Sequence, residues 1–166
     1  MKVEGRTWVF GDDISTDLLY PQVAYSMDPD EAPQAVFRAN RPGWSAQVEA
    51  GDIIVGGRNF GMGSSRPAAV LLRRLGIGAC IAESMTAIFL RNCINSGLPP
   101  VVCPNVRELV EEGQRVRVDL AEGMVENLET GEFAQGQPLP AFLIETLDAG
   151  GVIPRLKQQG FLPTSG

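Results

Sequence analysis

Residues 52–66 read Asp-Ile-Ile-Val-Gly-Gly-Arg-Asn-Phe-Gly-Met-Gly-Ser-Ser-Arg, and Pro67 follows them. The first four residues form an apolar strand, the glycines permit a tight turn, and the proline is expected to open a helix because its fixed φ suits that position. The order predicts a strand–turn–helix corner. The two serines and the arginine would then lie where free backbone N–H groups and the positive end of the helix dipole attract an anion.

Strands and helices are expected to alternate after this corner. Apolar spacing and glycine stops predict a helix at residues 67–75, a strand at 79–82, a helix at 84–95, a strand at 100–103 and a short helix at 106–112. Strand, helix, strand, helix and strand within about 50 residues imply parallel pairing with crossover helices.

The flanking segments have a different pattern. We expect a strand at residues 7–10, a polar turn at 11–17, an extended segment at 18–21, a short helix at 30–39, antiparallel strands at 115–119 and 122–128 with a turn at 129–132, and a helical stretch at 140–159 interrupted near Gly150. No internal repeat or linker is visible. The sequence therefore predicts one domain, residues 1–166, of mixed α/β class with a parallel core flanked by helices.

Composition narrows the class of partner. The chain has 166 residues, 44% of them hydrophobic and 20% charged, which suits a globular domain with its own core. A formal net charge of −6 argues against nucleic acid, because phosphate neutralisation needs a basic face. No apolar run approaches the roughly 20 residues of a membrane span, and the first residues lack the apolar core of a signal peptide. We expect a cytoplasmic protein without a membrane partner.

Histidine is absent from the whole sequence. A Ser-His-Asp triad, a histidine base and a histidine-bound zinc within this chain are therefore excluded. Cys80, Cys93 and Cys103 form no C-x-x-C pair, so a metal or iron–sulfur site built from this chain alone is not expected. All three lie in apolar runs, which favours buried, reduced packing residues.

The corner has a structural and a functional interpretation. As a purely structural feature, a serine would cap the helix and the glycines would permit the turn. Neither a P-loop nor a dinucleotide-binding pattern fits, since the P-loop lysine is missing and Gly63 is followed three residues later by Arg66. Two hydroxyls with one guanidinium fit a carboxylate ligand, which arginine can bind in bidentate fashion.

Several short motifs occur together in one order. They are residues 11–17 (GDDISTD), 51–55 (GDIIV), 59–66 (NFGMGSSR), 81–84 (IAES), 88–89 (IF), 91–92 (RN) and 97–99 (GLP). This series resembles the small subunit of 3-isopropylmalate dehydratase, which is the swivelling domain of the aconitase superfamily. The resemblance covers roughly residues 5 to 150 and implies that domain's β/β/α fold, with a mixed sheet flanked by helices.

The resemblance implies a reaction and a partner. In the family, a large subunit holds a [4Fe–4S] cluster through three cysteines, the small subunit closes over it, and the active site lies between them. The reaction is dehydration and rehydration of a hydroxy-dicarboxylic acid, in which the cluster iron, a Lewis acid, takes the hydroxyl. The implied activity is that of a hydro-lyase of leucine biosynthesis, active only as a heterodimer, with no cofactor held by this chain.

The resemblance also assigns residues. Ser65 would be the catalytic base that takes the proton from carbon. Ser64 and Arg66 would bind a substrate carboxylate, and Asn59, Gly63 and Asp17 would line the substrate site. For the aspartates of residues 12–17, a solvated turn is the structural alternative.

Two departures from the family leave the substrate open. The family usually continues Glu-His-Ala after Ser-Ser-Arg, whereas this chain has Pro67-Ala68-Ala69, so support for Arg66 must differ. The segment after residue 20 also has no arginine before Arg38. A related acid such as a methylmalate, dimethylmalate or homoaconitate is therefore an alternative substrate, and a non-catalytic anion-binding paralogue is an alternative function. A subunit should expose an apolar patch, and we expect it around residues 18–27 and 60–66.

Overall fold

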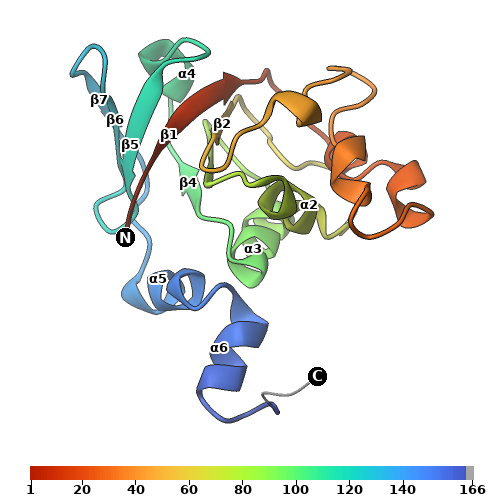
Figure 1. Ribbon diagram of the computed structural model, residues 1–166. Coiled ribbons are helices and arrows are strands. Elements are labelled where there is room, and N and C mark those ends of the chain that lie inside the picture. The colour runs from red at the N-terminus through yellow and green to blue at the C-terminus, as the bar shows by residue number, and fades with distance from the viewer. Residues whose placement is uncertain (164–166) are drawn as a thin grey trace.

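A mixed seven-stranded sheet organises the protein. The computed structural model describes residues 1–163, and the strand order is β4-β3-β2-β1-β5-β6-β7 (Figure 1). The strands are β1 (Lys2–Val9), β2 (Ile53–Gly56), β3 (Ala79–Ala82), β4 (Pro100–Val102), β5 (Arg115–Asp119), β6 (Met124–Asn127) and β7 (Phe133–Gln135). β1 to β4 are parallel, and β5 to β7 extend the sheet by antiparallel pairing.

β1 belongs to both halves of the sheet. Its first part, from Lys2 to Arg6, pairs antiparallel with β5, and its last part, from Thr7 to Val9, pairs parallel with β2. The two edges of the sheet also approach each other. The backbone N–H of Gln137, just after β7, donates to the carbonyl of Val102 in β4 at 2.8 Å. The sheet is therefore curled.

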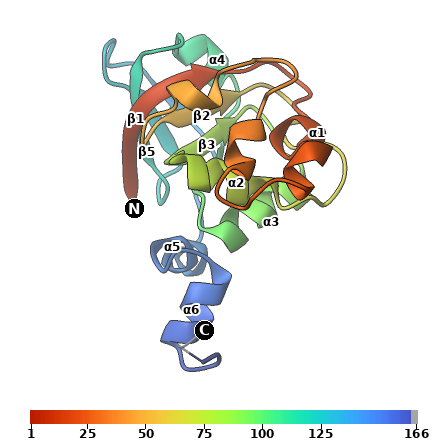
Figure 2. The same ribbon diagram turned by 45° about the vertical axis from the view of Figure 1, so that its right-hand side comes forward.

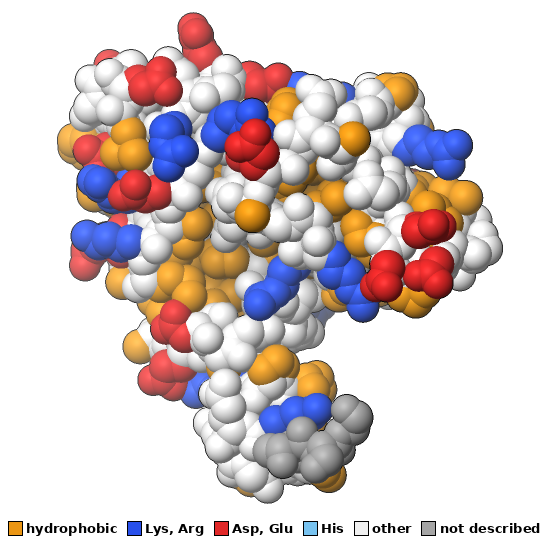
Figure 3. Space-filling model, in the orientation of Figure 1, with side chains coloured by type: hydrophobic (Ala, Val, Ile, Leu, Met, Phe, Trp, Pro, Cys, Tyr) orange, Lys and Arg blue, Asp and Glu red, His pale blue; other side chains and the backbone are white. Residues whose placement is uncertain are grey.

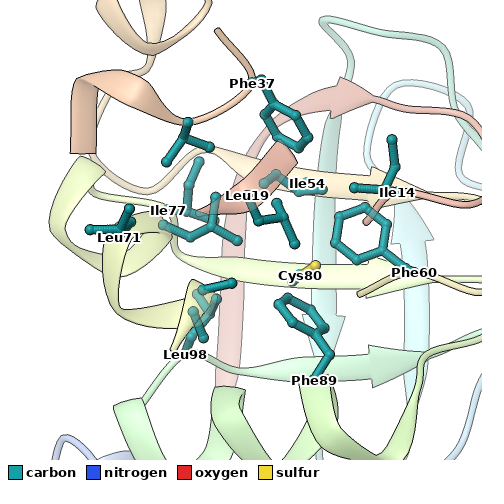
Figure 4. Packing of buried hydrophobic residues seen from close by; sticks show 14 of the residues in the cluster. Ile14, Leu19, Phe37, Ile54, Phe60, Leu71, Ile77, Cys80, Phe89 and Leu98 are labelled. Carbon is teal, nitrogen blue, oxygen red and sulfur yellow. The ribbon is translucent and has the colours of Figure 1, made fainter. Parts of the chain in front are cut away.

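Two hydrophobic clusters lie on opposite faces of the parallel strands. Ile54 and Cys80 belong to the cluster that packs against α2 (Ala68–Leu75) and α3 (Ala87–Ser96), which Figure 4 shows in close-up. Their strand neighbours Ile53 and Ile81 belong to a second cluster, together with valines of β5 and β6. Because successive strand residues face opposite sides, strands buried on both faces read as continuous apolar runs.

The C-terminal helices extend from the lower end of the sheet. α5 (Ala141–Asp148) contributes Leu147 to the second cluster beside Ile94 of α3. α6 (Val152–Gln158) follows after Gly150 and Gly151 and lies beyond the body of the protein in both views (Figures 1 and 2).

Short elements complete the chain. They are α1 (Thr16–Leu19), α4 (Val106–Leu109) and three 3-10 turns at Gln22–Tyr25, Ala32–Ala35 and Ser45–Gln47. The turn Ala32–Ala35 packs against α2, and Ala24, Ala35 and Trp44, the last of them just before the third 3-10 turn, belong to the first cluster.

Most of the expected elements are confirmed, including the parallel core, the antiparallel extension and the interrupted C-terminal helix. Residues 18–21 were expected to be extended, but α1 runs through Leu19 because Ser15 caps it, accepting a hydrogen bond from the backbone N–H of Leu18. The expected helix at residues 30–39 is wrong except for the 3-10 turn Ala32–Ala35. The helix expected from residue 84 begins at Ala87, since Thr86 is its N-cap.

Asp52 joins β1 to the start of β2. Its buried carboxylate accepts hydrogen bonds from Arg6 at 2.7 Å, from the indole N–H of Trp8 at 2.7 Å and from the backbone N–H of Glu49 at 2.9 Å. Burial alone raises the pKa of this carboxyl, but the bonds from Arg6, Glu49 and Trp8 outweigh it and leave the pKa below its ordinary value.

We expect Asp52→Ala to lower the free energy of unfolding by about 2–4 kcal/mol at pH 7, measured by urea denaturation, because three donors lose a buried acceptor. A carboxyl with a lowered folded pKa stabilises the fold above its unfolded pKa of about 3.9, and this contribution disappears as pH falls through the folded value. The difference between wild type and variant should therefore shrink below about pH 4. An equal difference at pH 7 and at low pH would contradict the assignment.

Gly61 lies between the sheet and α3. Its φ is +78°, and a Cβ placed there would come within 2.2 Å of the Phe89 Cβ. We expect Gly61→Ala to destabilise the protein by more than the roughly 1 kcal/mol that a left-handed backbone costs alone. Gly131→Ala is the matched control, since its φ is +75° with no atom within 4 Å. Equal melting temperatures of the two variants would show that the contact with Phe89 carries no cost.

Candidate active site

Loops from four parallel strands meet at the carboxyl edge of the sheet. The backbone N–H of Asp13 donates to Arg58 at 2.9 Å, and that of Gly61 donates to Ile14 at 2.7 Å, so the loop after β1 lies along the loop after β2. The N–H of Phe60 donates to the carbonyl of Ser84, after β3, at 3.0 Å. Loop 57–66, yellow in Figure 2, therefore runs between the other two beside α1 and α3.

Asn59 is fixed in a left-handed conformation with a φ of 59°. Its side-chain amide donates to the carboxylate of Asp13 at 2.9 Å, and its backbone N–H donates to the hydroxyl of Ser84 at 2.8 Å. Asparagine tolerates this backbone region better than most residues. In the structure Asn59 therefore joins the three loops, in addition to any contact with a ligand.

The glycines of the corner allow close approaches. Gly63 has a φ of +109°, and a Cβ there would lie 3.0 Å from the Thr16 hydroxyl oxygen. The next residue, Ser64, has its hydroxyl oxygen 3.5 Å from that of Thr16, which is fully buried. Gly63, Ser64 and Ser65 are exposed. Both serine side chains are therefore on the surface, and α1 supports one of them.

Neither serine caps the following helix. α2 begins at Ala68, its N-cap residue is Pro67, and no side chain makes a capping hydrogen bond there. The helix was expected to open at Pro67 and begins one residue later. The interpretation of the corner as a serine cap is therefore wrong, and the two hydroxyls are not used in that structural role.

Arg66 is anchored at the same corner. Its Nη1 donates to the carbonyl of Tyr20 at 2.8 Å and lies 2.8 Å from a carboxylate oxygen of Asp17. The amide of Asn92, on α3, donates to the carbonyl of Arg66 at 3.0 Å. The Arg66 side chain is 22% exposed, whereas that of Asp17 is 71% exposed. The guanidinium is thus held by α1 and its C-cap while part of it faces solvent.

These contacts show how Arg66 is supported although neither Pro67 nor Ala68 has a polar side chain. Ala68 lies completely buried against the first cluster and offers no polar group to Arg66. Support for Arg66 comes from Asp17, the Tyr20 carbonyl and Asn92 instead. Asp17 is expected in the site from the sequence, whereas Tyr20 and Asn92 are not. The motif RN at residues 91–92 was the available signal for Asn92.

A charged cluster lies beside the corner. Arg107 of α4 contacts the carboxylate of Asp12 at 2.9 Å and that of Glu83 at 3.3 Å. Asp12 also accepts a hydrogen bond from the backbone N–H of Arg58 at 2.8 Å. This bond, together with the nearby guanidinium groups, lowers the pKa of the Asp12 carboxyl. Asp12 is therefore an ionised anchor for loop 57–66, and not only a solvated turn residue.

The surface next to Arg66 is hollowed and partly apolar. A cavity of about 290 Å³ is bounded by Tyr20, Tyr25, Met27, Pro67, Val70 and Arg74, among others. Tyr25 is 53% exposed and Val23 41% exposed, as expected for an apolar patch around residues 18–27, whereas Phe60, in the expected part at residues 60–66, is completely buried. Figure 3 shows apolar and acidic side chains together at the right of the view, where Figure 1 shows these N-terminal segments. More exposed apolar side chains lie elsewhere, at Phe133, Phe142 and Phe161.

The cysteines are buried, as expected. Burial raises the pKa of the Cys80 and Cys93 thiols well above the ordinary value and that of Cys103 to about 11, which disfavours thiolates. Within residues 1–163 no group of three or more His, Cys, Asp or Glu side chains is arranged to hold a metal. In the same range, no helix has the length and apolar character needed to cross a membrane.

Comparisons with known proteins show which family the chain resembles. The family model described as the aconitase C-terminal domain matches residues 13–106. The 3-isopropylmalate dehydratase small subunit 1 of Methanopyrus kandleri is 45% identical over 95% of this chain and 94% of its own length. The isopropylmalate/citramalate isomerase small subunit of Methanocaldococcus jannaschii is 46% identical over 95% of both.

A solved structure has the same fold. The crystal structure of 3-isopropylmalate dehydratase from Methanocaldococcus jannaschii superposes with a TM-score of 0.87 at 33% identity, covering 97% of this chain and 96% of that one. The match extends over the curled sheet and the C-terminal helices, not only over the motifs. With its anchored Arg66 and its loops at the carboxyl edge of the parallel strands, the chain belongs to the aconitase superfamily and, within it, to the family of 3-isopropylmalate dehydratase small subunits.

Proposed function

We propose that this chain, acting as one swivelling domain over residues 1–166, is the small subunit of a two-subunit hydro-lyase of the 3-isopropylmalate dehydratase type. The enzyme would isomerise a hydroxy-dicarboxylic acid by dehydration and rehydration. The observation that carries the proposal is the pairing of two exposed serines, free of any capping role, with a guanidinium already held in place by Asp17 and Tyr20.

Ser65 is the proposed base. It would take the proton from the carbon next to a carboxylate and return it during rehydration. An ordinary serine hydroxyl is too weak a base for this step, so its alkoxide must be stabilised. The adjacent Arg66 and the start of α2 supply positive charge on this chain, and both favour an anionic oxygen.

Arg66 and Ser64 are the proposed carboxylate ligands. The Nη1 atom of Arg66 faces Asp17 and the Tyr20 carbonyl, and the rest of the guanidinium is available for a bidentate contact with substrate. Asp17 would serve the substrate site by orienting Arg66, since two carboxylates do not attract each other. Gly63 would let the substrate approach the backbone closely, and Asn59 would hold the loop that lines the site.

A second chain is needed to complete this site. The corner is exposed, and within residues 1–163 the three buried cysteines are not grouped as the ligands of a [4Fe–4S] cluster would be. We therefore assign the cluster, with its Lewis-acid chemistry, to a large subunit that closes over Arg66, with Val23 and Tyr25 at the contact. We further propose a cytoplasmic location and a role in leucine biosynthesis.

The proposed substrate is 3-isopropylmalate, in line with the name of the Methanopyrus kandleri relative. The name of the Methanocaldococcus jannaschii relative also includes citramalate, a methyl-substituted acid. The apolar wall formed by Tyr25, Met27 and Val70 beside Arg66 suits an aliphatic substituent on the acid. A methylmalate, dimethylmalate or homoaconitate remains the alternative substrate.

Reconstitution with a cluster-bearing large subunit tests the function. We expect the isolated chain to be inactive and the pair to interconvert 3-isopropylmalate and its isomer. In the pair, Ser65→Ala should lower kcat on the order of 10²–10⁴-fold, because the proton acceptor is lost. Ser45→Ala is the control, since that hydroxyl donates to the Gln34 carbonyl away from the corner.

Wild-type turnover by the Ser65→Ala pair would show that the assigned base is wrong. Calorimetry of the isolated chain tests the non-catalytic alternative. Sub-millimolar binding of a dicarboxylate by the chain alone, with no activity in any reconstituted pair, would favour an anion-binding module over half of an active site.

Arg66→Lys keeps the positive charge and removes the planar fork. We expect KM for the dicarboxylate to rise about 10- to 100-fold, because one bidentate contact with a charged group is lost. Steady-state kinetics of the reconstituted pair measures this effect, with Arg38→Lys on the exposed surface as the control. An unchanged KM would remove Arg66 from the substrate site.

A further inference from the structure

We propose that Arg107 is a positioning residue for loop 57–66 and acts on it through Asp12. The inference rests on the proposed function, because that loop carries Ser65 at its end. Arg107 lies on α4, after β4, and has no place in the motif that carries the serines. Its guanidinium contacts carboxylates from two other loops, Asp12 after β1 and Glu83 after β3.

Asp12 connects Arg107 to loop 57–66. One of its oxygens, Oδ1, lies 2.9 Å from Arg107 and also accepts the backbone N–H of Arg58 at 2.8 Å. The carboxylate rests on the backbone of Gly57, where a Cβ would come within 2.0 Å of Oδ1. Asp12 Oδ1 therefore holds the start of loop 57–66 together with two backbone hydrogen bonds, from Gly57 to the Gly11 carbonyl and from Asp13 to the Arg58 carbonyl, and Arg107 contacts that oxygen directly.

The three charged side chains of this cluster are partly buried, so solvent screens the contacts between them less than on an open surface. The Glu83 side chain is 14% exposed, that of Arg107 is 32% exposed and that of Asp12 is 33% exposed. Removing Arg107 would take away the cation that Asp12 and Glu83 share and would leave Asp12 only the longer contact with the Arg58 guanidinium, at 3.5 Å. We expect both carboxylates then to turn toward solvent, so that the Arg58 N–H loses its acceptor and the start of the loop is held less firmly.

The two ends of the corner depend on different anchors. Arg66 is held by Asp17, the Tyr20 carbonyl and Asn92, none of which contacts Arg107 in the structure. Ser65 lies near the end of loop 57–66, whose start Asp12 helps to hold. Loss of Arg107 should therefore displace the base more than the carboxylate ligand and affect kcat more than KM.

Arg107→Ala in the reconstituted pair tests the proposal. We expect kcat to fall about 10- to 100-fold, as for a base displaced by roughly 1 Å, with KM changed less than about threefold. Arg107→Lys should recover part of kcat, since one ammonium can reach one carboxylate but cannot bridge two. In the double variant with Asp12→Ala, the effects should be less than additive, because both changes remove one connection.

Arg117→Ala is the matched control. Arg117 also bridges two carboxylates, those of Glu4 at 2.6 Å and Glu126 at 3.1 Å, but it lies on β5 in the antiparallel half. We expect wild-type kcat and KM from this variant. A melting temperature measured for each variant separates a loss of positioning from a loss of folding.

A second measurement needs neither the partner nor activity. In the isolated chain, amide hydrogen exchange at Arg58 should accelerate about tenfold or more in Arg107→Ala and not in Arg117→Ala. Unchanged exchange at Arg58 overturns the proposal, and so does a kcat equal to that of Arg117→Ala or a loss confined to KM. An inactive wild-type pair contradicts the proposed function instead, and the exchange measurement still decides the coupling.

Discussion

β1 is the strand on which the rest of the structure depends. Its first half pairs with β5 and its second half with β2, so one continuous strand joins an antiparallel sheet to a parallel one. Asp52 reinforces this junction by accepting hydrogen bonds from Arg6 and Trp8 of β1. Because β1 to β4 are parallel, the loops that follow them lie at the same edge of the sheet, and the candidate site is formed by these loops.

At the corner, contacts within the fold hold one group of the candidate site, Arg66, in a defined orientation. Arg66 is oriented before any ligand is present, because its partners lie on α1, its C-cap and α3. Pre-oriented groups lose little conformational entropy when a substrate binds. Ser64 and Ser65 remain exposed, which suits a surface that a second subunit covers. The three cysteines of this chain are buried, and the chain has no histidine, which is in line with the proposal that a partner subunit holds the cluster.

Sequence patterns located the elements whose signals are local. The glycine at position 76 ends α2 in a left-handed cap, and the apolar runs at residues 53–55 and 79–82 are buried strands. Predictions from sequence patterns were wrong where tertiary contacts determine the backbone conformation. Residues 18–19 join α1 through the Ser15 cap and the contact of Thr16 with Met62, and residues 36–39 are not helical because Phe37 turns into the core with a φ of 56°.

By itself, the sequence determined the α/β class, the absence of a histidine from this chain, the family and the names of the candidate residues Ser64, Ser65 and Arg66. Composition and motif order are properties of the chain alone, so no coordinates are needed to identify them. Only the tertiary structure decided that neither serine caps α2, that Asp17 and Tyr20 hold Arg66, and that Arg107 is connected to the loop through Asp12. These contacts join residues more than forty positions apart or in different loops, and such pairings follow from the register of the sheet, which no local pattern encodes.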